Sequence, residues 1–297
     1  MVEATAPREL ARWSSDEARR AYRSERELLI PKQLQVRRNT VAEFKPGPIE
    51  IPRDVGFLFC EGSQFPHVPE VVSYARDVLA KTDLDQLKAA ANKRFMMKLL
   101  DQSLVTLESP LMRMALYPDI VATVSRYLGM VPILQFAGIY FSSESGEGLS
   151  KSQLYHCDSD DLEQVKVWVL CDDVTPESGP LTLLPAAESD LVRKTIGYRY
   201  DMELNDDQVS QILGVRNASR QFLGPAGTVG FLDTSRCLHF GSRFTDPTMT
   251  RLIVMLQYVT PLAFILPPKY RKGARYGELG AAAPGLDEVS RMVLGTW

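Results

Sequence analysis

The chain has 297 residues, with 34 basic and 37 acidic side chains and a net charge of −3. Apolar residues make up 45% of it and charged residues 24%, values that exclude a disordered or fibrous chain. The sequence has no sustained basic stretch, so we expect no nucleic-acid partner. No apolar run approaches the roughly 20 residues of a membrane-spanning helix, so we expect no membrane partner either.

The cysteines and the N-terminal residues bear on location. Met1–Thr5 lack the basic start and apolar core of a secretory signal. The four cysteines form no CxxC pair, and a chain of this length needs no disulfides to fold. We therefore predict a cytoplasmic protein with reduced thiols.

The N-terminal part, residues 1–130, is predicted to be mainly helical. A peripheral helix capped by Ser14 or Ser15 is expected to end before Pro31. Apolar residues at helical spacing and glycine or proline at the boundaries predict three more helices. The four predicted helices cover 15–29, a segment starting at Pro69, 84–100, and 118–128.

The sequence then changes to short β-rich segments separated by Gly, Pro, Asp and Ser. This pattern predicts a sandwich or jelly roll over 131–262, within a single domain of mixed α+β class. An inserted lid is expected over about 186–223, with a helix at Asn205–Leu213, and an irregular tail over 263–297. The predicted strands are 132–142, 152–158, 164–174, 181–185, 228–233, 236–240 and 250–260.

Two of the three histidines belong to a candidate metal site. On a strand, alternation places His156 and Asp158 on one face and Cys157 on the other. His239 follows a predicted strand further along the chain. Two histidines and one carboxylate on one face of a metal leave three positions open, as oxygen activation by non-haem Fe(II) requires.

A fourth residue suggests a cosubstrate. Arg251 lies twelve residues after His239, within another predicted strand. An inward guanidinium can bind one end of a dicarboxylate with two hydrogen bonds, whereas a lysine supplies a point charge.

These residues resemble the phytanoyl-CoA dioxygenase family. The resemblance lies in HCD (156–158), VTPESGPLTLLP (174–185), GTVGFLD (227–233), His239 and Arg251, and it covers about residues 118–261. Family members are Fe(II)- and 2-oxoglutarate-dependent oxygenases on a double-stranded β-helix. The resemblance thus implies a jelly-roll (cupin-like) core and three reactants besides the substrate: Fe(II), 2-oxoglutarate and O2.

Carried over residue by residue, the resemblance implies His156, Asp158 and His239 as iron ligands and Arg251 as the anchor for the distal carboxylate of 2-oxoglutarate. Ser242 resembles the hydroxyl that shares this carboxylate, although Phe240 adds one residue to the usual His-Gly-Ser spacing. Trp168 and Gln135 resemble residues that contact the cosubstrate, and Lys98 a lysine found in part of the family.

The implied reaction is hydroxylation of a C–H bond in a small or medium polar metabolite, with release of succinate and CO2. Halogenating members have a small residue where this chain has Asp158, which disfavours a halogenase. The pocket walls are expected in the 186–223 insertion and the tail, where Arg193, Lys194, Arg199 or the basic cluster at 269–275 can meet an anionic group.

Other interpretations remain open. A zinc hydrolase or isomerase can use the same three ligands but has no use for Arg251, and a catalytically silent ligand-binding jelly roll is a third possibility. Trp168 and Gln135 also fit an ordinary core, and His67 is expected to be structural. A Cys157–His156 nucleophile is disfavoured because strand neighbours face opposite ways. Cys237 is expected to serve packing, and the acidic run 158–161 lacks the pattern of a calcium loop.

Overall fold

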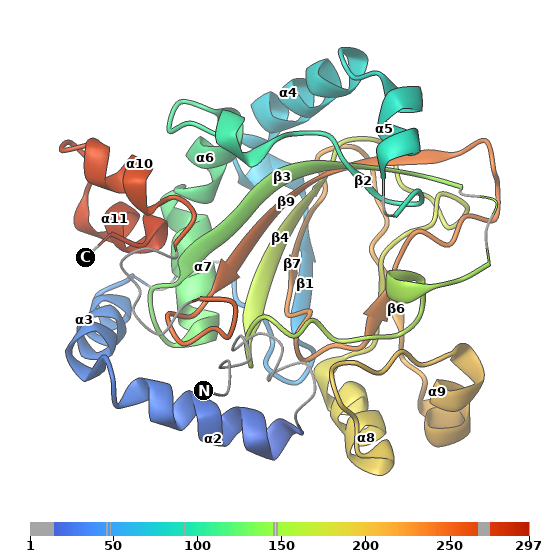
Figure 1. Cartoon of the computed structure of the whole chain (residues 1–297), viewed down its shortest axis with the longest axis horizontal. Coiled ribbons are helices and arrows are strands. Elements are labelled where there is room, and N and C mark those ends of the chain that lie inside the picture. Colours follow the sequence, from blue (N-terminus) through green and yellow to red (C-terminus); the bar gives the residue numbers. More distant parts are fainter. Residues whose placement is uncertain are drawn as a thin grey trace, which may run out of the picture.

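The computed structural model of the chain describes residues 15–266 and 274–296, apart from positions 46, 48, 92, 145 and 147. Two antiparallel sheets and several helices make up this part of the chain (Figure 1). The helices are α2 (Asp16–Glu27), α3 (Pro31–Ala42), α4 (Val68–Ala80), α5 (Leu84–Ala90), α6 (Pro110–Ala115), α7 (Pro118–Leu128), α8 (Ala186–Ile196), α9 (Asp206–Leu213), α10 (Gly277–Ala282) and α11 (Glu288–Leu294). The strands are β1 (Phe57–Cys60), β2 (Met97–Lys98), β3 (Ile133–Ser143), β4 (Gln164–Leu170), β5 (Thr182–Leu183), β6 (Arg220–Gln221), β7 (Val229–Leu232), β8 (His239–Phe240) and β9 (Thr250–Val259).

The larger sheet has six strands in the order β1-β7-β4-β9-β3-β2, and the smaller sheet has three in the order β6-β5-β8. Strand alternation gives the larger sheet two different faces. On β9, Leu252, Val254 and Leu256 belong to the core beneath the helices. Ile253 and Met255 belong instead to a second core that also includes Leu181 and Leu183 around β5. This second face therefore looks toward the smaller sheet, and we call it the inner face.

Helices cover the outer face of the larger sheet. Contacts join α4 and α6 to β9, α6 and α11 to β3, and α7 to β4; Figure 1 shows these helices together on one side of the sheet. The helix α7 follows the predicted pattern, since Ile120, Val121 and Val124 are buried and Gly129 ends it with a φ of 69°. The helices α8 and α9 lie beside the smaller sheet, where they share a third core with Tyr155 and Leu184.

The mixed α and antiparallel β class is confirmed, as are four of the predicted helices in position: α2, α4, α7 and α9. The cap of α2 is Ser15, which accepts a hydrogen bond from the backbone N–H of Ala18; Ser14 lies outside the described residues. The sequence analysis treated Pro31 only as a stop. Pro31 also begins α3, since proline fits the first turn of a helix.

Several predicted elements were wrong. The helix predicted over 84–100 ends at Ala90, and Met97–Lys98 form β2. Residues 152–158 form no strand, and only Tyr155 and His156 make isolated bridges there. The insertion contains α8 as well as α9, and the described part of the tail carries α10 and α11. Short elements such as β2, α10 and α11 depend on tertiary partners more than on local pattern.

Candidate metal centre and carboxylate pocket

His156, Asp158 and His239 converge at one point. One ligand atom from each lies within 4.8 Å of the others, and this is the one such group found among the described residues. The two imidazole centroids are 4.3 Å apart, and His239 Nε2 lies 3.9 Å from Asp158 Oδ2. The structure thus brings together the three residues that the sequence analysis selected.

The backbone explains why the two histidines meet. His156 and His239 form an antiparallel bridge in which each backbone N–H donates to the other's carbonyl at 3.0 Å. The Nδ1 atoms lie 2.9 Å from the carbonyl oxygens of Leu154 and Cys237 respectively. When Nδ1–H donates to a carbonyl, Nε2 keeps its lone pair for a metal.

The histidines are also held neutral. Burial lowers the pKa of His156, and burial together with the neighbouring His156 lowers the pKa of His239 to about 3. Metal binding requires a neutral imidazole, so no deprotonation is needed at neutral pH.

Two residues of β4 hold Asp158, and the sequence analysis did not select either. Lys166 Nζ donates to Asp158 Oδ2 at 2.6 Å, and Gln164 Nε2 donates to the same oxygen at 3.0 Å. Burial raises the pKa of Asp158, but Lys166 and the two imidazoles outweigh it and hold that pKa below its usual range. A signal was available: Gln164 and Lys166 alternate with Val165 and Val167, as expected for polar residues on one face of a buried strand.

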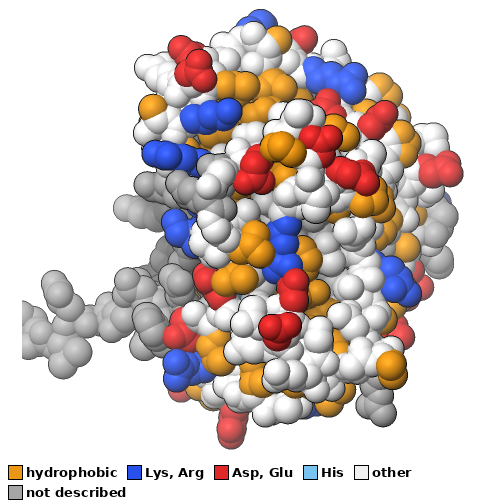
Figure 2. Space-filling model, turned by 90° about the vertical axis from the view of Figure 1, so that its right-hand side faces the viewer, with side chains coloured by type: hydrophobic (Ala, Val, Ile, Leu, Met, Phe, Trp, Pro, Cys, Tyr) orange, Lys and Arg blue, Asp and Glu red, His pale blue; other side chains and the backbone are white. Residues whose placement is uncertain are grey.

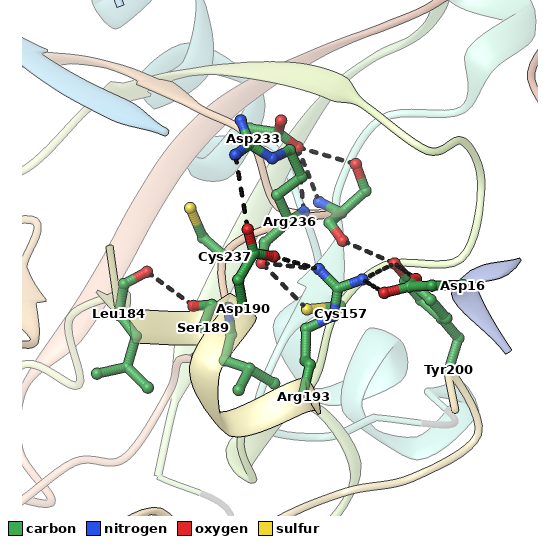
Figure 3. A network of polar contacts seen from close by, with 12 residues as sticks. Asp16, Cys157, Leu184, Ser189, Asp190, Arg193, Tyr200, Asp233, Arg236 and Cys237 are labelled. Atoms are coloured by element: carbon green, nitrogen blue, oxygen red, sulfur yellow. Dashed lines mark hydrogen bonds and ion pairs between the residues drawn. The ribbon is translucent and has the colours of Figure 1, made fainter. Parts of the chain in front are cut away.

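A polar network positions the segment that carries His239 (Figure 3). Arg193 of α8 donates to Tyr200 Oη at 2.8 Å and pairs with Asp16 of α2. Ser189 of α8 accepts a hydrogen bond from the backbone N–H of Leu238, the residue directly before His239. Arg193 was considered as a substrate-binding cation, but its side chain is 5% exposed and is engaged in this network.

Asp233 anchors the other side of the same segment. Its carboxylate accepts hydrogen bonds from Tyr127 and Ser235 at 2.8 Å, and burial raises its pKa to about 6. The next carbonyl, of Thr234, accepts a 2.8 Å hydrogen bond from the backbone N–H of Asp158. The loop that leads to His239 therefore also fixes the backbone of Asp158.

Arg251 and Ser242 form a second polar group on the inner side. Arg251 is 1% exposed; it donates to Ser242 Oγ at 2.9 Å and to the carbonyl of Gly179, and its Nε is buried without a partner. No carboxylate of the described residues pairs with it, and burial lowers its pKa to about 10. Ser242 has a φ of 61°, a left-handed conformation that is uncommon for non-glycine residues.

This guanidinium lies close to the metal ligands in the chain and in space. Ser242 follows His239 by three residues, which is at most about 10 Å of extended chain. A β-carbon placed on the intervening Gly241 would lie 3.6 Å from Arg251 Nη2. A buried cation and three metal-type ligands therefore share one region between the two sheets.

The remaining predicted residues are less closely tied to this region. Trp168 lies on the inner face with its Nε1 buried and unpartnered, and the Oε1 atom of Gln135 is likewise buried without a partner among the described residues. Gln135 sits at a β-bulge, at the end of β3 opposite to the Arg251 pairing. Lys98 is exposed, with its ammonium 5.4 Å from the Phe136 ring centroid.

The excluded candidates have structural contacts. Cys157 packs in the core beside α8 and α9, and Cys237 packs against the backbone of Val55. His67 lies at the start of α4 with its ring edge against Tyr117. Lys269, Arg271 and Lys272 of the proposed basic cluster lie outside the described residues.

The charge pattern on one face of the molecule and the lengths of its helices bear on possible partners. On the side drawn in Figure 2, acidic and basic side chains of the described residues are interspersed, with no extended basic patch. Among the helices that the structure describes, none has the length and apolar character needed to cross a bilayer.

No protein-family model matches the chain, and no curated protein matches it. Solved structures do. The chain is similar to EctD from S. alaskensis with bound Fe (19% identity, 75% of this chain and 76% of that chain, TM-score 0.49). It is also similar to the non-heme alpha ketoglutarate dependent epimerase SnoN from nogalamycin biosynthesis (18%, 77% and 84%, 0.47). A third is HygX from Streptomyces hygroscopicus with nickel and 2-oxoglutarate bound (16%, 70% and 84%, 0.49). At these values the function of this chain has to be argued from its own site.

Proposed function

We propose that the chain is an Fe(II)- and 2-oxoglutarate-dependent dioxygenase, built on a jelly-roll core over 131–262. Its reaction is hydroxylation of a C–H bond in a small or medium polar metabolite, with release of succinate and CO2. The four free thiols suit a cytoplasmic location.

Arg251 is the observation that carries this proposal. Burying a guanidinium without a carboxylate is costly, and a bound carboxylate would supply the missing charge. The unpartnered Nε and the Ser242 hydroxyl beside Nη2 offer a carboxylate several hydrogen-bond donors at once. A dicarboxylate that reaches from Arg251 toward the histidines fits this arrangement.

The donor set also fits ferrous iron. His156 and His239 present neutral imidazoles, and Asp158 presents a carboxylate that Lys166 and Gln164 hold ionised. When bound, iron together with 2-oxoglutarate and O2 supplies the oxidising chemistry. The protein binds the metal through these three residues and orients the cosubstrate through Arg251 and Ser242. Trp168 and the apolar inner face exclude water from the region between the sheets.

A zinc hydrolase or a silent binding protein accounts for fewer of these observations. Zinc binds the same three ligands, but hydrolysis needs no buried guanidinium beside the metal ligands. A silent jelly roll needs neither the ionised Asp158 nor the metal-ready Nε2 atoms.

Anaerobic titration of the metal-free protein with Fe(II) and then 2-oxoglutarate tests the proposal. We expect a weak visible metal-to-ligand charge-transfer band that requires both additions. We also expect succinate to form once O2 and a substrate are supplied. Stoichiometric Fe(II) binding with no band at saturating 2-oxoglutarate would contradict the proposal.

A further inference from the structure

Lys166 is a cation at the metal centre that the proposed function does not use. It lies on β4 in register with Gln257 of β9 and Leu232 of β7. Six residues along β9 separate Gln257 from Arg251, a span of about 20 Å. Lys166 therefore lies toward the end of the inner face opposite to the proposed carboxylate anchor.

The described structure gives Lys166 one anionic partner, and that partner is the carboxylate proposed to bind the metal. Its side chain is 13% exposed and its ammonium lies 2.6 Å from Asp158 Oδ2. A second carboxylate, that of Asp160, accepts a hydrogen bond from the Gln257 amide. Gln257 also donates to Gln164, which in turn donates to Asp158, so the Gln164 amide links this pair to Asp158. A divalent cation bound to Asp158 would thus share its carboxylate with an ammonium of like charge.

A second lysine adds to this positive charge. Lys93 Nζ donates to Ser152 Oγ at 3.2 Å. Although much of the side chain is exposed, partial burial of the ammonium lowers the pKa of Lys93, and Asp158, Lys166, Lys151 and the exposed Glu203 all act on it. Lys93 is therefore close enough to Asp158 and Lys166 to interact with both electrostatically.

The charges of the loaded centre can be counted on the basis of the proposed function. The charges of Fe(II) and of the 2-oxoglutarate dianion cancel, and so do those of Asp158 and Arg251. The imidazoles are neutral. Of the other charged groups named above, Lys166, Lys93 and Lys151 then outnumber Asp160 and Glu203 by one positive charge. An excess positive charge in a partly dehydrated place favours an incoming anion.

We propose that Lys166, with Lys93, forms an anion-binding position beside the metal ligands, and that the substrate carries a carboxylate or phosphate group that binds there. In the metal-free protein Asp158 is the counter-ion of Lys166. Once Asp158 coordinates the metal, the anionic group of the substrate replaces Asp158 as the counter-ion of Lys166. Metal binding and anion binding are therefore coupled through Lys166, and the coupling rests on the proposed metal centre.

Mn(II) binding, followed through the spectrum of the free ion without 2-oxoglutarate, tests the coupling. The probes are benzoate and phenyl phosphate, with benzyl alcohol as the uncharged control. In the wild type we expect either anion to raise Mn(II) affinity about tenfold and the alcohol to leave it unchanged. The anion with the larger effect identifies the group, carboxylate or phosphate, that the site prefers.

The Lys166→Met variant gives a result with a distinctive sign. Without an anion it should bind Mn(II) about tenfold more tightly than the wild type, because the like charge beside Asp158 is gone. A purely structural lysine predicts the opposite, since loss of a residue that positions Asp158 would weaken metal binding. Lys166→Gln, which keeps a hydrogen-bond donor, should behave like Lys166→Met, and Lys166→Arg should keep the anion effect.

Two further variants separate this proposal from the proposed function. Lys81→Met removes an exposed lysine at the end of α4. It should leave the Mn(II) affinity and the effect of the anions on it unchanged. Arg251→Leu should keep the benzoate effect while losing the response to 2-oxoglutarate. The anion position is overturned if Lys166→Met weakens or does not change Mn(II) affinity, or if Arg251→Leu abolishes the benzoate effect. Failure of the wild type to bind Mn(II) or Fe(II) at all overturns the proposed function instead.

Discussion

Replacing Arg251 by leucine should change the stability of the ligand-free protein little and should greatly weaken the binding of 2-oxoglutarate. Burial lowers the pKa of Arg251 from 12.5 to about 10, which corresponds to roughly 3 kcal/mol against the charged form. Leucine removes this penalty. It also leaves the Gly179 carbonyl and the Ser242 hydroxyl without their donor, at about 1–3 kcal/mol each. The two effects oppose each other, so we expect ligand-free stability to fall by about 1 kcal/mol, within a range of about −1 to +3 kcal/mol.

In contrast, no opposing effect offsets the loss of 2-oxoglutarate binding in Arg251→Leu. Losing two charge-assisted hydrogen bonds weakens binding at least about 100-fold. At 100 times its dissociation constant, 2-oxoglutarate stabilises the wild type by about 2.7 kcal/mol. For a chain of 297 residues this raises the melting temperature by about 4 °C. We expect Arg251→Leu to shift by less than about 1 °C at that concentration when both proteins are melted anaerobically with Ni(II).

Arg37 provides a matched control. It is as buried as Arg251, but it donates to the carbonyls of Val131, Pro132 and Met292 at 2.7–3.0 Å. Leucine there leaves three acceptors without their donor instead of two, so Arg37→Leu should be about 1–3 kcal/mol more destabilising than Arg251→Leu and should leave the response to 2-oxoglutarate intact. The reasoning is refuted if 2-oxoglutarate stabilises Arg251→Leu as it does the wild type, or if Arg251→Leu is destabilised as much as Arg37→Leu.

Three other predictions follow from the same geometry. His156→Ala should lose metal on dialysis, and retention of stoichiometric iron would show that the centre lies elsewhere. The pKa of His239 is about 3 in the folded protein, so between that value and the ordinary histidine pKa the unfolded chain holds more protons than the folded one. The stability of the metal-free protein should therefore fall below about pH 6.5, by about 1.4 kcal/mol per pH unit for this histidine. Urea unfolding at about pH 7 and about pH 5.5 measures this slope, which should be smaller in His239→Gln. A thiol reagent should modify the half-buried Cys60 first and leave Cys157, whose pKa burial raises to about 12, untouched in the folded protein; rapid labelling that persists in Cys60→Ser would contradict this.

The sequence by itself determined the local features. Helical spacing and boundary residues located α7 and α9 because those helices carry their own caps and apolar faces. The HCD motif and the positions of His239 and Arg251 selected the residues of the site because few residue types can do that chemistry. The spacing missed α8, which is as long as α7 but, unlike α9, has no side-chain N-cap. It also missed α10 and β1, which are short and depend on the surfaces they pack against.

Tertiary structure decided how those residues are used. Asp158 meets Lys166 and Gln164 only because the chain turns back after the HCD motif and enters β4 with those two side chains on the inner face. Whether Arg251 has a carboxylate partner is likewise a property of every segment that surrounds it, and no local pattern reports it. The sequence therefore selected the candidate ligand groups, while only the folded chain showed which of their charges remain unbalanced, because that balance is set by neighbours far apart along the chain.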